Sequence, residues 1–301
     1  MKTYAASLVV LSLLAPMSQA QVIFSENFDG QTTGNTVSGF TAVTPSTATA
    51  RPTGRGSVIV DDTLPNRALN VYDYDTVNPT RVEQDFGPLS AAHVSLNFRR
   101  NADITIDTSA ESTRAFYLTM GLNGQSQGTQ ANRAIEVRLY DNGAYRLNRG
   151  VQDAGGNIVS SNLTPAAFFE PSGTTFNSHS LDLFVYSGLP GGSTLAYTGP
   201  DSSSRLLDPN SFALFIDGAL ITPTSGATAN GNFGIFNSAF YPTAANLGRM
   251  GFVSGGSSAI AGVDFIIDNV VLSQIAVPEP SSFAVLALGG LALAFRKRKT
   301  A

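Results

Sequence analysis

The stretch NVYDYDT, residues 70–76, gathers side chains that could bind a sugar. In an extended chain Tyr72 and Tyr74 share one face and Asp73 and Asp75 the other, because successive side chains of a strand alternate. An aromatic ring can stack on a sugar ring, and a carboxylate can accept hydrogen bonds from hydroxyl groups. The stretch predicts a carbohydrate-binding strand. An edge strand with surface acids is the alternative, which the absence of tryptophan favours.

Hydrolytic chemistry finds less support in the residue pattern. A glycosidase needs two carboxyl groups about 5–9.5 Å apart. No glutamate lies in a Glu-x-Asp-x-Glu or Glu-x-Asp-x-x-Glu pattern that would bring two carboxyls together on one strand. The run that begins at Glu83 starts like this pattern and then continues as FGP. The two histidines, His93 and His179, are far apart in the sequence. We therefore expect a non-catalytic protein.

Short alternating stretches must position these residues. In HVSLNFR, AFYLTMGL and AIEVRLY, apolar side chains alternate with polar ones, which is typical of half-buried strands. The turns Asp141-Asn142-Gly143 and Asp217-Gly218 contain residues that tolerate positive φ, and they predict hairpins. With no long amphipathic helix, the chain is expected to be all-β. Its predicted fold is a two-sheet antiparallel β-sandwich.

Composition narrows the partners and the chemistry. The chain has 301 residues, a net charge of −4 and no cysteine. All its lysines lie near the two ends, so the body between them is more acidic than the whole chain. Nucleic acid is not expected as a partner, because its binding depends on cationic contacts. The absence of cysteine excludes disulfides, thiolate chemistry and cysteine-ligated metals.

The two ends carry apolar segments that indicate export. Residues 1–20 combine Lys2, an apolar run and a small-residue Ser-Gln-Ala end, which predicts a signal peptide that signal peptidase removes before Gln21. Residues 283–295 are mostly apolar. A helix over this run would rise only about 20 Å against a hydrocarbon core of about 30 Å. We expect a short transmembrane helix that anchors the chain transiently in the inner membrane.

The residues that flank this short helix complete a sorting signal. Before it lies Val277-Pro278-Glu279-Pro280, whose prolines favour an extended, accessible backbone. After it comes a cationic cluster that orients the helix with its C-terminal end in the cytoplasm: Arg296, Lys297, Arg298 and Lys299. We divide the chain into a signal peptide at 1–20, a body at 21–276 and a sorting signal at 277–301.

This C-terminal order resembles the PEP-CTERM sorting signal of Gram-negative bacteria. The resemblance implies that an exosortase-type enzyme recognises the Pro-Glu-Pro and removes the tail. It also implies an inner-membrane intermediate and a final place on the cell surface or in the extracellular matrix. The family is associated with exopolysaccharide and biofilm. The resemblance covers about the last 25 residues and implies nothing about the fold of the body.

The body has a second, shorter resemblance. VIFSENFDG near its start and FIIDNVVLS near its end resemble the first and last strands of laminin-G-like and carbohydrate-binding-module jelly rolls, which pair in one sheet. In that group, acids of these strands often hold a structural Ca²⁺, and the matching positions here are Glu26, Asp29 and Asp268. Ca²⁺ prefers oxygen ligands. Solvated acids at strand ends are the alternative.

Together these features predict an exported, non-catalytic protein of the cell surface or matrix, whose partner is a polysaccharide or another matrix protein. A carbohydrate-active hydrolase or lyase on a jelly-roll fold is the alternative from a different class. A third possibility is an envelope protein that keeps its tail.

Overall fold

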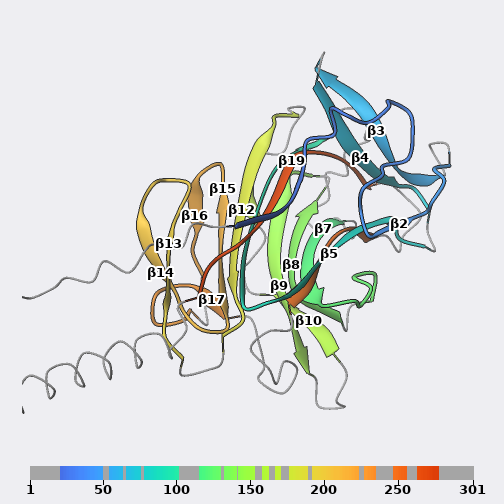
Figure 1. Ribbon diagram of the computed structural model, residues 1–301. Helices are drawn as coiled ribbons and strands as arrows, with labels where there is room; N and C mark the ends of the chain where they lie inside the picture. Colours follow the sequence, from blue (N-terminus) through green and yellow to red (C-terminus); the bar gives the residue numbers. More distant parts are fainter. Residues whose placement is uncertain are drawn as a thin grey trace, which may run out of the picture.

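Two β-sheets facing one another form the body in a computed structural model of the chain (Figure 1). The structure describes residues 21–49, 54–63, 66–75, 78–101, 115–129, 132–140, 142–152, 158–162, 167–170, 176–188, 192–223, 227–234, 247–255 and 263–277. The predicted signal peptide lies outside these ranges, as does the sorting signal after Val277. Among the described residues, no helix has the length and apolar character needed to cross a membrane.

The first sheet has β16, β15, β12, β6, β19, β4 and β3 in that order, and β1 and β17 add to β19 and β15. Its strands are β1 (Gln21–Glu26), β3 (Arg55–Thr63), β4 (Asn66–Asp73), β6 (Ala91–Arg100), β12 (His179–Tyr186), β15 (Ser211–Ile216), β16 (Ala219–Ile221), β17 (Phe233–Gly234) and β19 (Val263–Gln274).

The second sheet has the order β10, β9, β8, β7, β18, β5 and β2, and β11 adds to β9. Its strands are β2 (Ala42–Thr44), β5 (Arg81–Leu89), β7 (Ala115–Leu122), β8 (Arg133–Tyr140), β9 (Ala144–Gln152), β10 (Ile158–Asn162), β11 (Ala167–Phe168) and β18 (Leu247–Gly255). The chain crosses between the sheets repeatedly, for example from β4 to β5 and back to β6, as in Greek-key and jelly-roll sandwiches.

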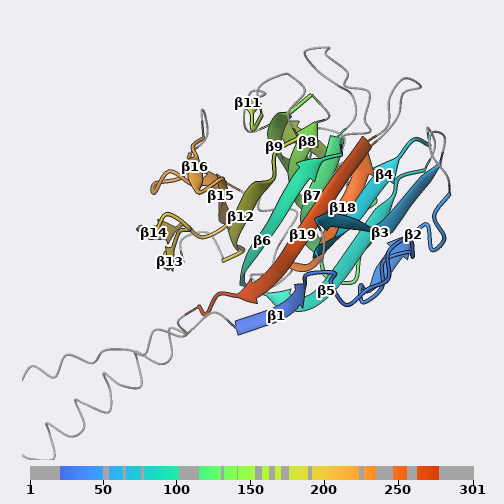
Figure 2. The ribbon, with the colours of Figure 1, turned by 90° about the horizontal axis from the view of Figure 1, so that it is seen from above.

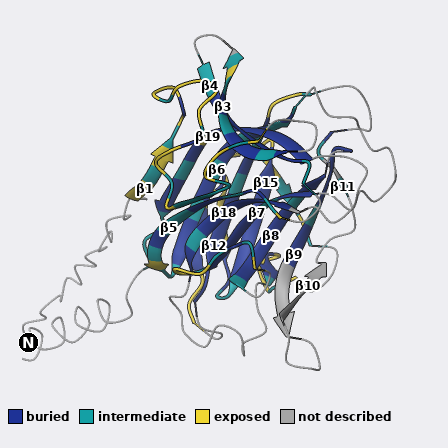
Figure 3. Ribbon diagram, turned by 90° about the vertical axis from the view of Figure 1, so that its right-hand side faces the viewer, coloured by how far each residue is buried: buried dark blue, intermediate teal, exposed yellow. Residues whose placement is uncertain are grey.

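The core lies between the two sheets, and Figures 2 and 3 show the facing layers and their buried strands. Alternate residues of the central strands enter it, such as Val94, Leu96 and Phe98 of β6 and Leu118 and Met120 of β7. The intervening side chains consequently face outward, because the side-chain period of a strand is two. The alternation in the sequence thus identified the core face of these strands correctly.

The predicted sandwich and the two predicted hairpins are confirmed. β8 and β9 pair across Asn142-Gly143, and β15 and β16 pair across Asp217-Gly218. Gly143, Asp217 and Gly218 have positive φ, as these tight turns require. The first and last strands of the body also pair, with Glu26 opposite Val270 and Gln21 opposite Gln274.

A small two-stranded sheet covers part of the outer face of the first sheet. It consists of β13 (Leu195–Thr198) and β14 (Ser204–Leu207), which the chain inserts between β12 and β15. Its apolar side chains and those of the first sheet form a second cluster, called the outer cluster here, with the members Ala91, Phe184, Tyr186, Leu195, Tyr197, Leu207, Ala213 and Phe215.

Candidate functional site

A row of polar side chains crosses the outer face of the second sheet. The strand registers align Glu83 of β5, Gly251 of β18, Thr119 of β7, Glu136 of β8 and Asn148 of β9. The four side chains of the row are at most 3% exposed, although they face away from the core. Buried polar groups need partners. We call these four side chains, together with Gly251, the polar row.

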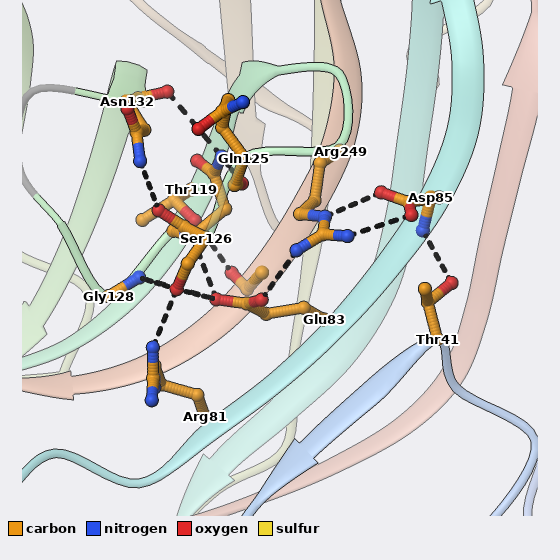
Figure 4. A network of polar contacts seen from close by, with 12 residues as sticks. Thr41, Arg81, Glu83, Asp85, Thr119, Gln125, Ser126, Gly128, Asn132 and Arg249 are labelled. Atoms are coloured by element: carbon orange, nitrogen blue, oxygen red, sulfur yellow. Dashed lines mark hydrogen bonds and ion pairs between the residues drawn. The ribbon is translucent and has the colours of Figure 1, made fainter.

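At one end of the row, Arg249 joins two carboxylates (Figure 4). Its Nη1 lies 3.0 Å from Glu83 Oε2, and its Nε and Nη2 lie 2.5 and 2.8 Å from the two oxygens of Asp85. The hydrogen bonds with Arg249 lower the pKa of Asp85, and the same contacts raise the pKa of Arg249. One guanidinium thus contacts both carboxylates, and its two-pronged contact with Asp85 favours the charged form of that residue.

The β7–β8 loop folds onto the second oxygen of Glu83 (Figure 4). Glu83 Oε1 accepts hydrogen bonds from Ser126 Oγ at 3.1 Å, from the Gln127 backbone N–H at 2.7 Å and from the Gly128 backbone N–H at 3.3 Å. Arg81 Nη1 donates to Ser126 Oγ at 2.6 Å. Glu83 therefore connects the loop to the sheet, and the loop covers this part of the polar row.

Two glycines provide the space for that cover. A Cβ on Gly121 would lie 1.9 Å from the Asn132 carbonyl oxygen and 2.5 Å from Gln127 Oε1. A Cβ on Gly251 would lie 2.9 Å from Gln127 Cβ. The Gln127 side chain occupies the space beside both glycines, and its Nε2 donates to the carbonyl oxygens of Gln125 and Asn132. Larger residues at either glycine would push the loop away from the sheet.

Glu136, at the middle of the sheet, is bound by two arginines. Its Oε1 lies 2.9 Å from Arg133 Nη1 and its Oε2 lies 2.6 Å from Arg138 Nη2. Both guanidinium groups also lie over the ring of Tyr117, at 5.1 and 4.9 Å. Burial alone would raise the pKa of Glu136, but the charges of Arg138 and Arg133 outweigh it and the pKa is lowered. A general acid needs a raised carboxyl pKa, so Glu136 is not prepared for that role.

Ser126 is a residue that the sequence analysis missed. It lies in Gly124-Gln125-Ser126-Gln127-Gly128, a Gly-x-Ser-x-Gly stretch of the kind that carries a nucleophile in some hydrolases. Here the stretch is a loop between two strands and not a strand-to-helix turn. Both histidines of the chain lie in the first sheet, where His93 contacts Asp182 and His179 contacts Asp217. Ser126 consequently has a carboxylate as its acidic neighbour but no imidazole base.

The four predicted sugar-binding residues, Tyr72 to Asp75, lie at the end of β4 and in the two residues after it. Tyr72 and Tyr74 are neighbours, with ring centroids 6.3 Å apart. Tyr72 donates to the Thr49 carbonyl oxygen, and Tyr74 donates to the buried Asp264. Asp73 is only 4% exposed, and burial raises its pKa. Asp75 lies 3.6 Å from Arg55. The structure thus directs these polar groups into contacts within the protein.

The three acids predicted to hold calcium have local partners. Glu26 accepts from the Phe28 backbone N–H, and Asp29 accepts from the Arg67 backbone N–H. Asp268 accepts from Asn66 Nδ2 at 3.0 Å. Burial, and less strongly the charges of Asp62 and Asp29, raise the pKa of Asp268. Within the described ranges, no group of three or more histidine, aspartate or glutamate side chains is arranged to hold a metal.

The residue at which the predicted sorting signal begins lies against the body. Val277 and Ile275 pack on the outer cluster, directly after β19 ends at Gln274. Because Gln21 pairs with Gln274, both ends of the predicted body lie at the same end of the sandwich. The other predicted processing residues, Pro278 to Pro280, and the cationic cluster lie outside the described residues.

Comparison with known families confirms the C-terminal resemblance. Residues 276–299 match the PEP-CTERM protein-sorting motif. The motif indicates an exported protein that an exosortase sorts, with a final place at the cell surface or outside the cell. None of the curated proteins matches the chain significantly.

Solved structures with similar arrangements of strands include three proteins with carbohydrate-related names. The cellulose induced protein Cip1 is 10% identical and has a TM-score of 0.47, and the match covers 85% of this chain and 99% of that one. A glycoside hydrolase family 16 endo-glucanase from Bacteroides ovatus is 11% identical with a TM-score of 0.41, over 72% and 84%. Alginate lyase vAL-1 from Chlorella virus is 8% identical with a TM-score of 0.43, over 73% and 89%. At these values, the similarities decide nothing about activity.

Proposed function

We propose that this chain is a non-catalytic protein of the cell surface or extracellular matrix in a Gram-negative bacterium. In this proposal, an exosortase-type enzyme cuts the chain at Pro278-Glu279-Pro280, and the released body associates with exopolysaccharide or another matrix protein of a biofilm. The observation that carries the proposal is the sorting motif at residues 276–299, which comes directly after the last strand of the body.

The state of the polar row supports a non-catalytic role. Glu83 and Glu136 are the acids of the polar row, and each is bound to at least one arginine. Glu83 also accepts three hydrogen bonds from the covering loop. A pair of carboxyls that cleaves a glycosidic bond needs one protonated acid and open access to substrate. The arginines and the loop oppose both requirements.

The alternative is a carbohydrate-active hydrolase or lyase, and Ser126 beside Glu83 is the feature that favours it. The full chain would be incubated with a panel of acetylated and unmodified polysaccharides, together with Ser126→Ala and Glu136→Gln variants. We expect no product from any of them. Turnover by the unsubstituted chain that either variant abolishes would establish the enzyme and refute the proposal.

Sorting itself is tested by the intact mass of the protein recovered from cells and from the medium. We expect a mature form that begins at Gln21, ends near Pro278–Pro280 and sediments with exopolysaccharide. A variant with Glu279→Ala should keep its tail and stay with the membrane fraction. Shed protein that still carries Arg296–Lys299 would contradict the proposal.

A further inference from the structure

A pocket on the outer side of the first sheet lies apart from the polar row. Its volume is about 310 Å³, at the lower end of the roughly 300–1,000 Å³ of small-molecule sites. The small sheet β13–β14 supplies Tyr197, Arg205 and Leu206, while Leu220, Asn230 and Asn232 complete the lining. The pocket thus combines one cation, a phenol and two amides with apolar side chains.

Two polar groups of the pocket have no hydrogen-bond partner within the described part of the chain. They are the hydroxyl of Tyr197, a residue that is 93% buried, and Nε of Arg205. These two residues face each other across the β13–β14 pair. An unsatisfied buried polar group costs about 1–3 kcal/mol. Both atoms are closed to solvent, so a ligand oxygen gains these interactions only when the side chains at the pocket wall, such as the Asp201–Arg205 pair, rearrange to admit it.

The other side of the Arg205 guanidinium has a weakly held partner. Its Nη2 lies 2.5 Å from Asp201 Oδ2, and both side chains are about 30% exposed. Ion pairs at the surface contribute little to stability, so another carboxylate can replace Asp201 at modest cost. The guanidinium also lies 5.5 Å from the centre of the Phe215 ring, which limits its movement.

The two asparagines are fixed from behind by Asp208. Asn230 Nδ2 donates to Asp208 Oδ1 at 2.6 Å, and the Asp208 backbone N–H donates to Asn232 Oδ1 at 2.9 Å. The amides are therefore preorganised at the pocket wall, where they can meet hydroxyl groups. Leu206, which is 44% exposed, and Leu220 offer the apolar contact that the C–H face of a sugar ring requires.

We propose that this pocket binds a uronic acid residue of an acidic polysaccharide, with the carboxylate of the sugar on Arg205 in place of Asp201. The inference rests on the proposed matrix function and names the ligand class. A guanidinium matches a carboxylate in a bidentate geometry, and the two amides recognise the ring hydroxyls. A neutral sugar would leave Arg205 with Asp201 and lose this contact.

Calorimetric titration of the full chain with a glucuronate-containing disaccharide and its neutral glucose counterpart tests the proposal. We expect the acidic sugar to bind about tenfold or more tightly than the neutral one. Arg205→Gln should abolish this preference, and Asp201→Asn should strengthen acidic-sugar binding because it removes the competing carboxylate. Arg99→Gln is the matched control, since Arg99 pairs with Asp62 elsewhere on the protein.

Equal affinity for the two sugars, no binding of the acidic sugar, or weaker binding by Asp201→Asn would overturn the proposal. Unchanged far-UV circular dichroism shows that each variant is folded. Sedimentation with exopolysaccharide is measured on the same variants. If Arg205→Gln still sediments with exopolysaccharide, the role of the pocket is refuted but the matrix function is not. If the unsubstituted chain does not sediment with exopolysaccharide, the matrix function itself is refuted.

Discussion

Replacing Arg249 with methionine tests how much the ion pairs at the end of the polar row contribute to stability. The substitution keeps most of the apolar stem but leaves Glu83, whose side chain is 3% exposed, without its counter-ion. Breaking a buried ion pair from one side costs about 3–5 kcal/mol. The three hydrogen bonds from the loop still stabilise the Glu83 charge. We therefore expect the free energy of unfolding to fall by about 3 kcal/mol, at the lower end of that range. Asp85 adds little, because its side chain is 32% exposed.

Urea unfolding at pH 7 measures the loss, with tyrosine fluorescence as the signal because the chain has nine tyrosines and no tryptophan. For a domain of this size, about 3 kcal/mol corresponds to a fall of roughly 6–12 °C in melting temperature. Glu83→Gln in the Arg249→Met background removes the buried charge, and it should restore about 1–2 kcal/mol of the lost free energy of unfolding.

Asp201→Asn is the matched control, because it removes one partner of an exposed pair, and we expect no measurable change. A stabilising role of the Arg249–Glu83 pair is refuted if Arg249→Met is no more destabilising than this control. It is also refuted if the double variant is less stable than Arg249→Met alone.

Three further predictions concern the β7–β8 loop, the stability of the protein at low pH and the binding of calcium. Gly121→Ala should destabilise by about 1–3 kcal/mol and expose the loop to protease, because the new Cβ meets the Asn132 carbonyl oxygen; equal protease resistance would contradict this. Arg249 lowers the pKa of Asp85 below its usual 3.8, so this stabilisation is present above pH 3.8 and is lost as the pH falls through the lowered pKa. Asp85→Asn should therefore flatten the acid side of a stability–pH curve. A calcium site at Asp268 predicts a lower melting temperature with chelator, and an unchanged one in Asp268→Asn; no chelator effect on the unsubstituted chain would dismiss the site.

Local sequence patterns predicted the local structure well. Alternation in HVSLNFR and AFYLTMGL identified β6 and β7, because each strand buries one face and the pattern records it directly. Asn142-Gly143 and Asp217-Gly218 marked two hairpins, since the tolerance of positive φ is a property of the residue types themselves. Pairing of the first and last strands followed only from the jelly-roll resemblance.

The polar row could not be predicted in the same way. Glu83 and Arg249 are 166 residues apart in the sequence, and they meet because β5 pairs with β18. No local pattern encodes which distant strands become neighbours, so glutamates scattered along the sequence did not indicate a shared face. Ser126 was different, because its Gly-x-Ser-x-Gly signal was local. The partners that determine what it can do, Glu83 and Arg81, again come from a distant strand.

The position of β19 has a consequence for how the body assembles. It is the last strand of the body to be synthesised, yet it lies in the middle of the first sheet and pairs with β6 on one side and β4 on the other. Until it arrives, β4 and β3 share no ladder with β6 and the strands beyond it. Loop-closure entropy opposes such distant pairings, so assembly is slow and finishes only when nearly the whole chain is available. The sorting motif comes directly after β19 in the sequence. The strand that completes the sandwich therefore lies immediately before the segment that is recognised for sorting.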